Sequence, residues 1–310
     1  MPESLNIGHL STMYHTSFIL MGTDWLEKAD IKVNWSLFGG GPAIVRAFEG
    51  GEVDIGYVGL PPVMIGIDRG VPIKCVAGGH VEGTVMIASS RFMSLEKCQS
   101  PQHFFEQFKG LTIACPPGGS IHDVIIRNCI KNAGLDGEMT VQNYEWADMI
   151  PEGMADGNIE VAVGTPSLAV AAKRFCDADI DVRIVIPPDK LWPDNPSYGI
   201  IASNDLIENS PDVVSRFIEV HDRACSFMRM EPQKAAQIVA DKVGVVDSDF
   251  VYEMYGVSPK YSADLFDGYI ESTMKFVSVL YQLGFISRIL VEGDIFDMRF
   301  VGRYKKIKGK

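Results

Sequence analysis

Five turns of the sequence are rich in residues that can hold a small ligand through backbone and hydroxyl groups. They are residues 11–16 (STMYHT), 39–42 (GGGP), 59–62 (GLPP), 116–120 (PPGGS) and 163–167 (VGTPS). Glycine lets the backbone approach a ligand closely, and Ser or Thr at a helix start caps the helix. Free N–H groups at such a start, together with the helix dipole, favour an anion. The pair Gly119-Ser120 opens a long helical pattern and is the strongest such site.

Two histidines are candidates for chemistry at these turns. His15 and His122 each lie in a predicted loop or first helical turn, where either could contact a ligand or act as a general base. Asp123 follows His122, but adjacent residues of a helix point apart. Because no Ser/His/Asp set is identifiable by spacing, ligand contact is the better interpretation, and we assign no catalytic residue.

Aromatic residues near the turns are expected to line a cleft. Tyr14 lies in a turn rich in Ser and Thr, Trp146 follows a strand end, and Tyr198 lies where the chain is expected to cross between domains. Tyr57 lies within a predicted strand and is expected in the core. Lys and Arg are scarce in these loops, so an anionic ligand would depend on N–H and hydroxyl donors.

Several classes of function are excluded by missing motifs. The chain of 310 residues has no GxxxxGK[ST], GxGxxG or GxSxG pattern and no CxxC, HxxxH or HExxH spacing. We therefore expect no metal site and no cofactor. The net charge of −12 argues against nucleic acid as a partner. Of six widely spaced cysteines, Cys75, Cys115 and Cys129 sit among apolar residues and are expected to be buried free thiols.

Short runs rich in β-branched residues alternate with helical patterns, which predicts a largely parallel sheet with helices on both faces. The alternation restarts after a polar stretch at residues 89–100, so two blocks are expected. The predicted strands are residues 5–10, 32–38, 53–58, 73–78 and 84–88 in the first block, and 111–115, 139–144, 159–163 and 182–186 in the second.

The strand expected at residues 197–202 follows a proline-rich loop, and sending it back to the first block is the economical solution. The first lobe would then comprise residues 1–90 plus 197–310, and the second residues 91–196, with a cleft between them. A helix is expected at residues 17–28, and the chain is mostly helical from residue 210 onward. Ligands bind at the carboxyl ends of strands in such sheets, where the five turns lie.

The run from Phe38 to Gly59, FGGGPAIVRAFEGGEVDIGYVG, resembles the core of periplasmic-binding-protein-like proteins of the nitrate, sulfonate and taurine type (NMT1-like). Residues 61–74, 109–120 and 283–297 also fit, so the resemblance covers nearly the whole chain. It implies an α/β, two-lobed type II periplasmic-binding-protein fold, in which each lobe is a mostly parallel sheet flanked by helices.

The resemblance also implies a function: a solute-binding protein that closes over an anionic or heterocyclic metabolite and delivers it to an ABC permease. Matched by position, the family's ligand contacts fall on Tyr14, His15, Gly40, Gly41, Gly59, Leu60, Pro61, Gly119, Ser120 and Thr165. To these the turn chemistry adds Ser11, Gly118, Trp146 and Tyr198.

Two other functions stay open on the same scaffold. One is a cytosolic enzyme similar to those of pyrimidine-precursor synthesis or of an alternative menaquinone route, with His15 or His122 as acid or base. The cysteine-rich motif of the fungal pyrimidine enzyme is absent. The other is a ligand sensor. No secretory signal and no membrane-spanning run is visible, so an extracytoplasmic location would require that a signal had been removed, and the location is otherwise cytoplasmic.

Overall fold

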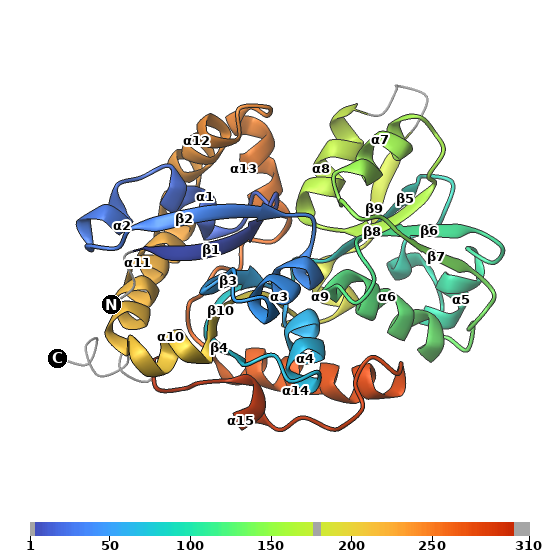
Figure 1. Ribbon diagram of the computed structural model, residues 1–310. Helices are drawn as coiled ribbons and strands as arrows, with labels where there is room; N and C mark the ends of the chain where they lie inside the picture. The colour runs from blue at the N-terminus through green and yellow to red at the C-terminus, as the bar shows by residue number, and fades with distance from the viewer. Residues whose placement is uncertain (1–3, 176–180, 301–310) are drawn as a thin grey trace.

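The structure is a computed structural model that describes residues 4–175 and 181–300. Two five-stranded sheets, each flanked by helices, form two lobes that lie side by side in Figure 1. This is the two-lobed α/β architecture that the alternation of strand and helix patterns predicts. Among the described residues, no helix has both the length and the apolar character needed to cross a bilayer.

The sheet of the first lobe has the strand order β2-β1-β3-β10-β4. Its strands are β1 (Leu5–Leu10), β2 (Val33–Phe38), β3 (Ile55–Val58), β4 (Ile73–Val81) and β10 (Pro196–Ser203). β1 runs parallel to β2 and β3, whereas β10 is antiparallel to both β3 and β4. The helices packed around this sheet are α1 (Thr16–Met21), α2 (Trp25–Lys28), α3 (Gly41–Glu49), α4 (Leu60–Asp68), α10 (Asn204–Asn209), α11 (Pro211–Met230), α12 (Pro232–Val243), α13 (Ser248–Val257), α14 (Asp267–Gln282) and α15 (Glu292–Ile295).

The sheet of the second lobe has the order β7-β6-β8-β5-β9 and the same design. Its strands are β5 (Val85–Ser89), β6 (Thr112–Cys115), β7 (Thr140–Asn143), β8 (Val161–Gly164) and β9 (Val182–Ile186). β6 runs parallel to β7 and β8, and β5 is antiparallel to β8 and β9. Its helices are α5 (Pro101–Glu106), α6 (Ile121–Asn132), α7 (Met149–Ala155), α8 (Pro166–Phe175) and α9 (Pro188–Leu191), with a 3₁₀ turn at Leu95–Lys97.

The reversed strand of each sheet is the one that arrives from the other lobe. β10 enters the first sheet after the second lobe is complete, and β5 enters the second sheet directly after β4. Residues 84–88 were expected in the first lobe, but β5 pairs with β8 and β9, so the chain leaves the first sheet before residue 85 rather than near residue 90. An apolar strand of this kind fits either sheet, because its hydrophobic pattern predicts that it is buried but not which strand it pairs with.

The helix expected at residues 17–28 is two short helices in the structure. Gly22 ends α1, with its N–H donated to the Phe18 carbonyl at 3.0 Å, and Asp24 stands at the start of α2. Glycine is a poor helix residue, so the chain breaks and turns at this point. The turn lets α1 pack against α11 and α12 while α2 lies nearer the surface.

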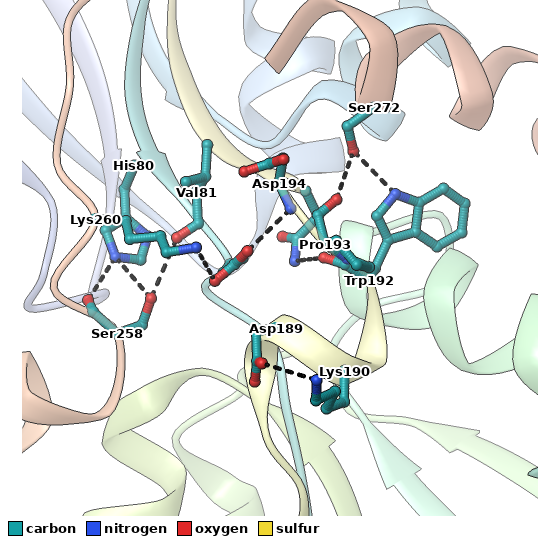
Figure 2. A network of polar contacts seen from close by, with 12 residues as sticks. His80, Val81, Asp189, Lys190, Trp192, Pro193, Asp194, Ser258, Lys260 and Ser272 are labelled. Carbon is teal, nitrogen blue, oxygen red and sulfur yellow. Dashed lines mark hydrogen bonds and ion pairs between the residues drawn. The ribbon is translucent and has the colours of Figure 1, made fainter. Parts of the chain in front are cut away.

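The two crossover segments are tied to each other, as Figure 2 shows from close by. Glu82 follows β4 with φ of 62°, and Asp194 precedes β10 with φ of 53°. The Glu82 carboxylate accepts the Asp194 N–H at 3.1 Å and pairs with Lys260 at 2.8 Å, while the Glu82 N–H is donated to the Asn195 carbonyl at 2.9 Å. A positive φ is strained for residues other than glycine. The hydrogen bonds and the ion pair of this network hold both crossovers in that conformation.

The largest part of the apolar core joins the two lobes. One hydrophobic cluster runs from Ile44 and Leu60 of the first lobe to Ile121 and Val124 of the second. Helices α4 and α6 are in contact at its centre. The lobes therefore meet over apolar surface, in a closed arrangement, beside the strand ends that carry the predicted turns.

The cysteines among the described residues are free. Cys75, Cys115 and Cys225 are buried, and Cys98 and Cys129 are half-buried. The expectation of free thiols holds for Cys75, Cys115 and Cys129, with Cys129 more accessible than expected. Cys176 lies outside the described residues.

Candidate functional site

A cavity of about 50 Å³ lies between the lobes, at the carboxyl ends of their strands. One water molecule needs a cavity of roughly 10–15 Å³, so this cavity has room for a small polar group. The cavity is lined by Leu10, Ser11, Thr12, Tyr14, His15, Gly39, Gly40, Gly41, Gly59, Pro62, Pro116, Pro117, Ser120, Ile121, His122, Ala147, Thr165 and Ser197. None of these lining residues is Lys, Arg, Asp or Glu.

Four helices point their N-termini at this cavity, two from each lobe. Gly40 and Gly59 are the N-cap residues of α3 and α4, Ser120 caps α6, and Thr165 directly precedes α8. All four residues line the cavity. First-turn N–H groups have no acceptor inside their own helix, and the four dipoles place partial positive charge at the same point. The cavity is therefore electropositive without a cationic side chain.

Prolines in these first turns limit which N–H groups are available. Pro42 and Pro61 occupy an early position of α3 and α4, and Pro166 opens α8, so those positions donate nothing. Donors remain at Gly41, which opens α3, and at Ile121, which opens α6. Together with the hydroxyls of the lining they give the cavity several hydrogen-bond donors.

Two imidazoles face the cavity, one from each lobe. His15 stands before α1 and His122 lies in the first turn of α6. Burial lowers the pKa of His122 to about 4, and burial followed by repulsion from His80 and other imidazoles holds the pKa of His15 well below its ordinary value. Both are neutral at pH 7, and a neutral imidazole donates from one nitrogen and accepts at the other.

The two imidazoles differ in their partners. His122 Nδ1 lies 3.0 Å from Thr84 Oγ1, whereas His15 Nδ1 is buried with no hydrogen-bond partner in the part of the chain that the structure describes. The hydroxyl of Tyr14, the residue before His15, is hydrogen-bonded to Ser197 Oγ at 2.8 Å. An unpartnered buried nitrogen is costly, and it is uncommon in a folded protein.

Contacts across the cavity hold the lobes close together. Ser11 Oγ donates to Asp148 Oδ2 at 2.5 Å. A Cβ on Gly40 would lie 2.8 Å from Pro117 Cγ, closer than real Cβ atoms approach. Glycine at position 40 is therefore required by the approach of the second lobe.

Eight of the fourteen predicted site residues line the cavity. These are Ser11, Tyr14, His15, Gly40, Gly41, Gly59, Ser120 and Thr165. The turns that carry them are the ones in which Gly, Ser and Thr cluster, and the strand-end rule brings the turns together.

The remaining six predicted residues do not line it. Leu60, Pro61, Gly118, Gly119, Trp146 and Tyr198 lie nearby but face elsewhere. The Gly119 N–H is donated to Asp123 Oδ2 at 2.9 Å, so it is not available to a ligand. Gly118 and Gly119 instead border a neighbouring cavity of about 180 Å³.

The aromatic residues that were expected at the site lie at different depths in the structure. Tyr198 is fully buried behind His15, with ring centroids 4.1 Å apart, and its hydroxyl accepts the Thr16 N–H. Trp146 is 38% exposed at the rim, and a Cβ on Gly39 would lie 3.1 Å from its ring. Tyr57 is in the core, as expected.

Sequence reasoning omitted some lining residues. Thr12, Gly39, Pro62, Pro116 and Pro117 lie in the same five turns and carried the same signal. His122 was a candidate but was not placed in the predicted set. Ser197 and Ala147 carried no signal, because Ser197 lies at the start of β10 and Ala147 in the loop after β7.

The comparisons with known proteins agree with this geometry. A profile of the NMT1-like family matches residues 1–243, which is most of the chain. The chain belongs to the NMT1-like family. A curated relative from Brucella abortus strain 2308, classed by name among binding proteins, is 25% identical over 250 residues, covering 76% of this chain and 70% of its own.

Two solved structures show the same fold for this NMT1-like protein. The ligand-binding component of an ABC-type import system from Staphylococcus aureus, with zinc bound, has a TM-score of 0.79 and 14% identity, covering 97% of this chain and 98% of its own. The periplasmic aliphatic sulphonate binding protein SsuA from Escherichia coli has a TM-score of 0.77 and 15% identity, covering 96% and 93%. Within residues 4–175 and 181–300, no three His, Cys, Asp or Glu side chains group as metal ligands.

Proposed function

We propose that this protein is a solute-binding component of an ABC importer and that its cavity holds a small anionic group between the lobes. The observation that carries the proposal is the convergence of four helix N-termini and two imidazoles on one cavity with no charged side chain in its lining. Helix N-termini bind anions through N–H groups and the dipole. Two neighbours of this fold are a component of an import system and a sulphonate-binding protein, which supports the assignment.

The size of the cavity favours an anionic group over a larger ring system. A volume of about 50 Å³ matches nitrate, a carboxylate or the head of a sulfonate better than a substituted heterocycle. An anion with a longer chain would place only its head between α3, α4, α6 and α8. The net charge of −12 does not oppose this, because the local field of the helix ends acts at short range.

A ligand screen tests the proposal. Isothermal titration of the purified protein with nitrate, methanesulfonate, taurine and acetate is expected to give saturable binding for at least one anion. Uracil serves as the neutral heterocyclic comparison. Binding of uracil alone, or of nothing in the panel, would contradict an anion site.

Delivery to a permease and an extracytoplasmic location are parts of the same proposal. The S. aureus neighbour is named for an import system and the E. coli neighbour for the periplasm. In cells of the source organism, the protein is expected in the fraction released by osmotic shock or at the cell surface. Recovery with the cytosolic marker would contradict the location and favour the sensor or enzyme alternatives.

A further inference from the structure

His15 is a buried imidazole with no counter-ion among the described residues. His15 lies between β1 and α1, it is 2% exposed, and it lines the cavity between the lobes. Its Nδ1 has no hydrogen-bond partner among the described residues. The side chain is held in place by rings rather than by polar contacts: Tyr198, Tyr14 and Tyr57 lie with centroids 4.1, 5.1 and 5.9 Å from the imidazole. Neither ring nitrogen is hydrogen-bonded to a described residue, so the imidazole keeps donor and acceptor capacity for a ligand in the cavity.

Among the described residues, the titratable groups that contact His15 or shift its pKa are tyrosines and histidines from both lobes. They are Tyr14, Tyr57, Tyr198, His9, His80, His122 and His221. Burial and the neighbouring imidazoles hold the pKa of His15 well below its ordinary value. In the empty cavity the imidazole is neutral, because nothing nearby among the described residues compensates a positive charge.

An anion changes this balance. Opposite charge at close range favours the charged form of an imidazole, and the faces of tyrosine rings also favour a cation. His122, the other imidazole of the cavity, already has Thr84 Oγ1 at its Nδ1, so it gains less from a new partner. A permanent cation in this position would be stranded when the cavity is empty, whereas an imidazole can lose its charge.

We propose that the protein takes up one proton when it binds its anion, and that His15 holds this proton. The solute then enters as a neutral combination of anion and proton, so no Lys or Arg is needed in the lining. The proposal rests on the proposed function, since it concerns the same cavity. Beyond the proposed function, it states that the anion binds together with a proton, and it names His15 as the residue that makes binding depend on pH.

Linkage fixes the direction of the effect. Between the pKa of His15 in the empty protein and its higher pKa in the complex, the association constant rises up to tenfold for each unit by which pH falls. Above that window the affinity is low and constant, and below it the affinity is high and constant. A site without proton uptake would show no such slope.

The test uses methanesulfonate, which remains an anion across the whole range, so any proton that moves belongs to the protein. Titration calorimetry compares bis-tris with Tris at about pH 7.2, where both buffer, and the dissociation constant is measured from pH 5.5 to 8 at one constant chloride concentration. We expect the observed heat to differ between the buffers by the amount that corresponds to one proton taken up. We also expect the dissociation constant to rise with pH by up to tenfold per unit.

Variants assign the proton. His15→Gln should remove both the buffer dependence and the pH slope, while His122→Gln should keep the slope even if it weakens binding. His103→Gln, on an exposed histidine of α5, is the matched control. Binding by the wild-type protein with no buffer dependence would overturn proton uptake, and a slope that survives His15→Gln would overturn the residue. The wild-type measurement needs no variant to fold.

The failure of the proposed function looks different. If methanesulfonate, nitrate and acetate all fail to bind at any pH in the range, the anion site itself is wrong and proton uptake falls with it. If one of them binds and the affinity is flat with pH, the anion site stands and only the role of His15 is overturned.

Discussion

The cavity and the crossover network bury polar groups within the same few strands, yet His15 in the cavity and Glu82 at the crossover differ in their partners. At the crossover, the carboxylate of Glu82, 4% exposed, meets the ammonium of Lys260 and the N–H of Asp194. In the cavity, His15 is buried equally well but has no partner at Nδ1 and no counter-ion.

The difference separates structure from function. A buried charge with its partners in place needs nothing from outside, so the crossover network serves to fix how the chain passes between the lobes. A buried polar group without a partner costs stability, and in a cavity a ligand can supply the missing partner. Changes at the crossover should therefore alter folding, and changes in the cavity should alter binding.

Acid is expected to have the largest effect, and to act on the imidazoles in and behind the cavity. Burial lowers the pKa of His80, His122 and His221 to about 4 from an ordinary value of 6.5. A lowered pKa means that their contribution to stability is complete above pH 6.5 and is lost as pH falls toward 4. At pH 5 each histidine costs about 2 kcal/mol of unfolding free energy. Urea denaturation at pH 7 and pH 5 measures this loss, and equal stability at both would contradict neutral imidazoles.

Glu82→Ala tests the crossover side. It leaves the Asp194 N–H without an acceptor and Lys260 without its partner, so the free energy of unfolding should fall by about 1–3 kcal/mol. Glu138→Ala, an exposed glutamate before β7, is the control and should change little. Urea denaturation is the measurement. If Glu82→Ala folds as stably as the wild type, the network does not hold the crossovers.

Gly40→Ala tests the approach of the lobes over the cavity. The added Cβ would lie 2.8 Å from Pro117 Cγ, so the lobes must move apart to accept it. We expect at least roughly tenfold weaker binding of the anion found in the screen, equal to about 1.4 kcal/mol. Gly256→Ala in α13, where a Cβ meets nothing within 4 Å, should leave the affinity unchanged. Equal affinities for the two variants would show that closure does not depend on Gly40.

Arg174 supplies the smallest expected effect. It joins α8 of the second lobe to α13 through Asp247 at 3.0 Å and Glu253 at 2.9 Å, but both carboxylates are largely exposed. Exposed pairs contribute roughly 0–1 kcal/mol. Arg174→Ala should lower the free energy of unfolding by less than about 1 kcal/mol and the ligand affinity not at all. If Arg174→Ala lowers the free energy of unfolding as much as Glu82→Ala does, this surface ion pair stabilises the protein as strongly as the crossover network.

The sequence predicts the cavity best where backbone chemistry decides it. Gly40, Gly59, Ser120 and Thr165 each follow a strand and precede a helix, so their place at the strand ends follows from local pattern alone. Gly119 carried the same signal, but its N–H is donated to Asp123, a contact that no local pattern states.

Other features depend on which strands pair. β5 belongs to the second sheet although its residues follow directly on β4, because an apolar strand does not specify its neighbours. Ser197 reaches the cavity only because β10 returns to the first sheet. Tyr198, its neighbour, therefore points to the opposite side of the strand, into the core. The missing partner of His15 also depends on tertiary contacts and cannot be read from the sequence.

The most direct test of an anion site between the lobes is a crystal structure of the protein with methanesulfonate. The account predicts the sulfonate group in the cavity, within hydrogen-bond distance of His15 and of the N–H groups that open α3 and α6. A sulfonate found only at another place, such as the neighbouring cavity beside Arg46 and Arg69, would contradict it.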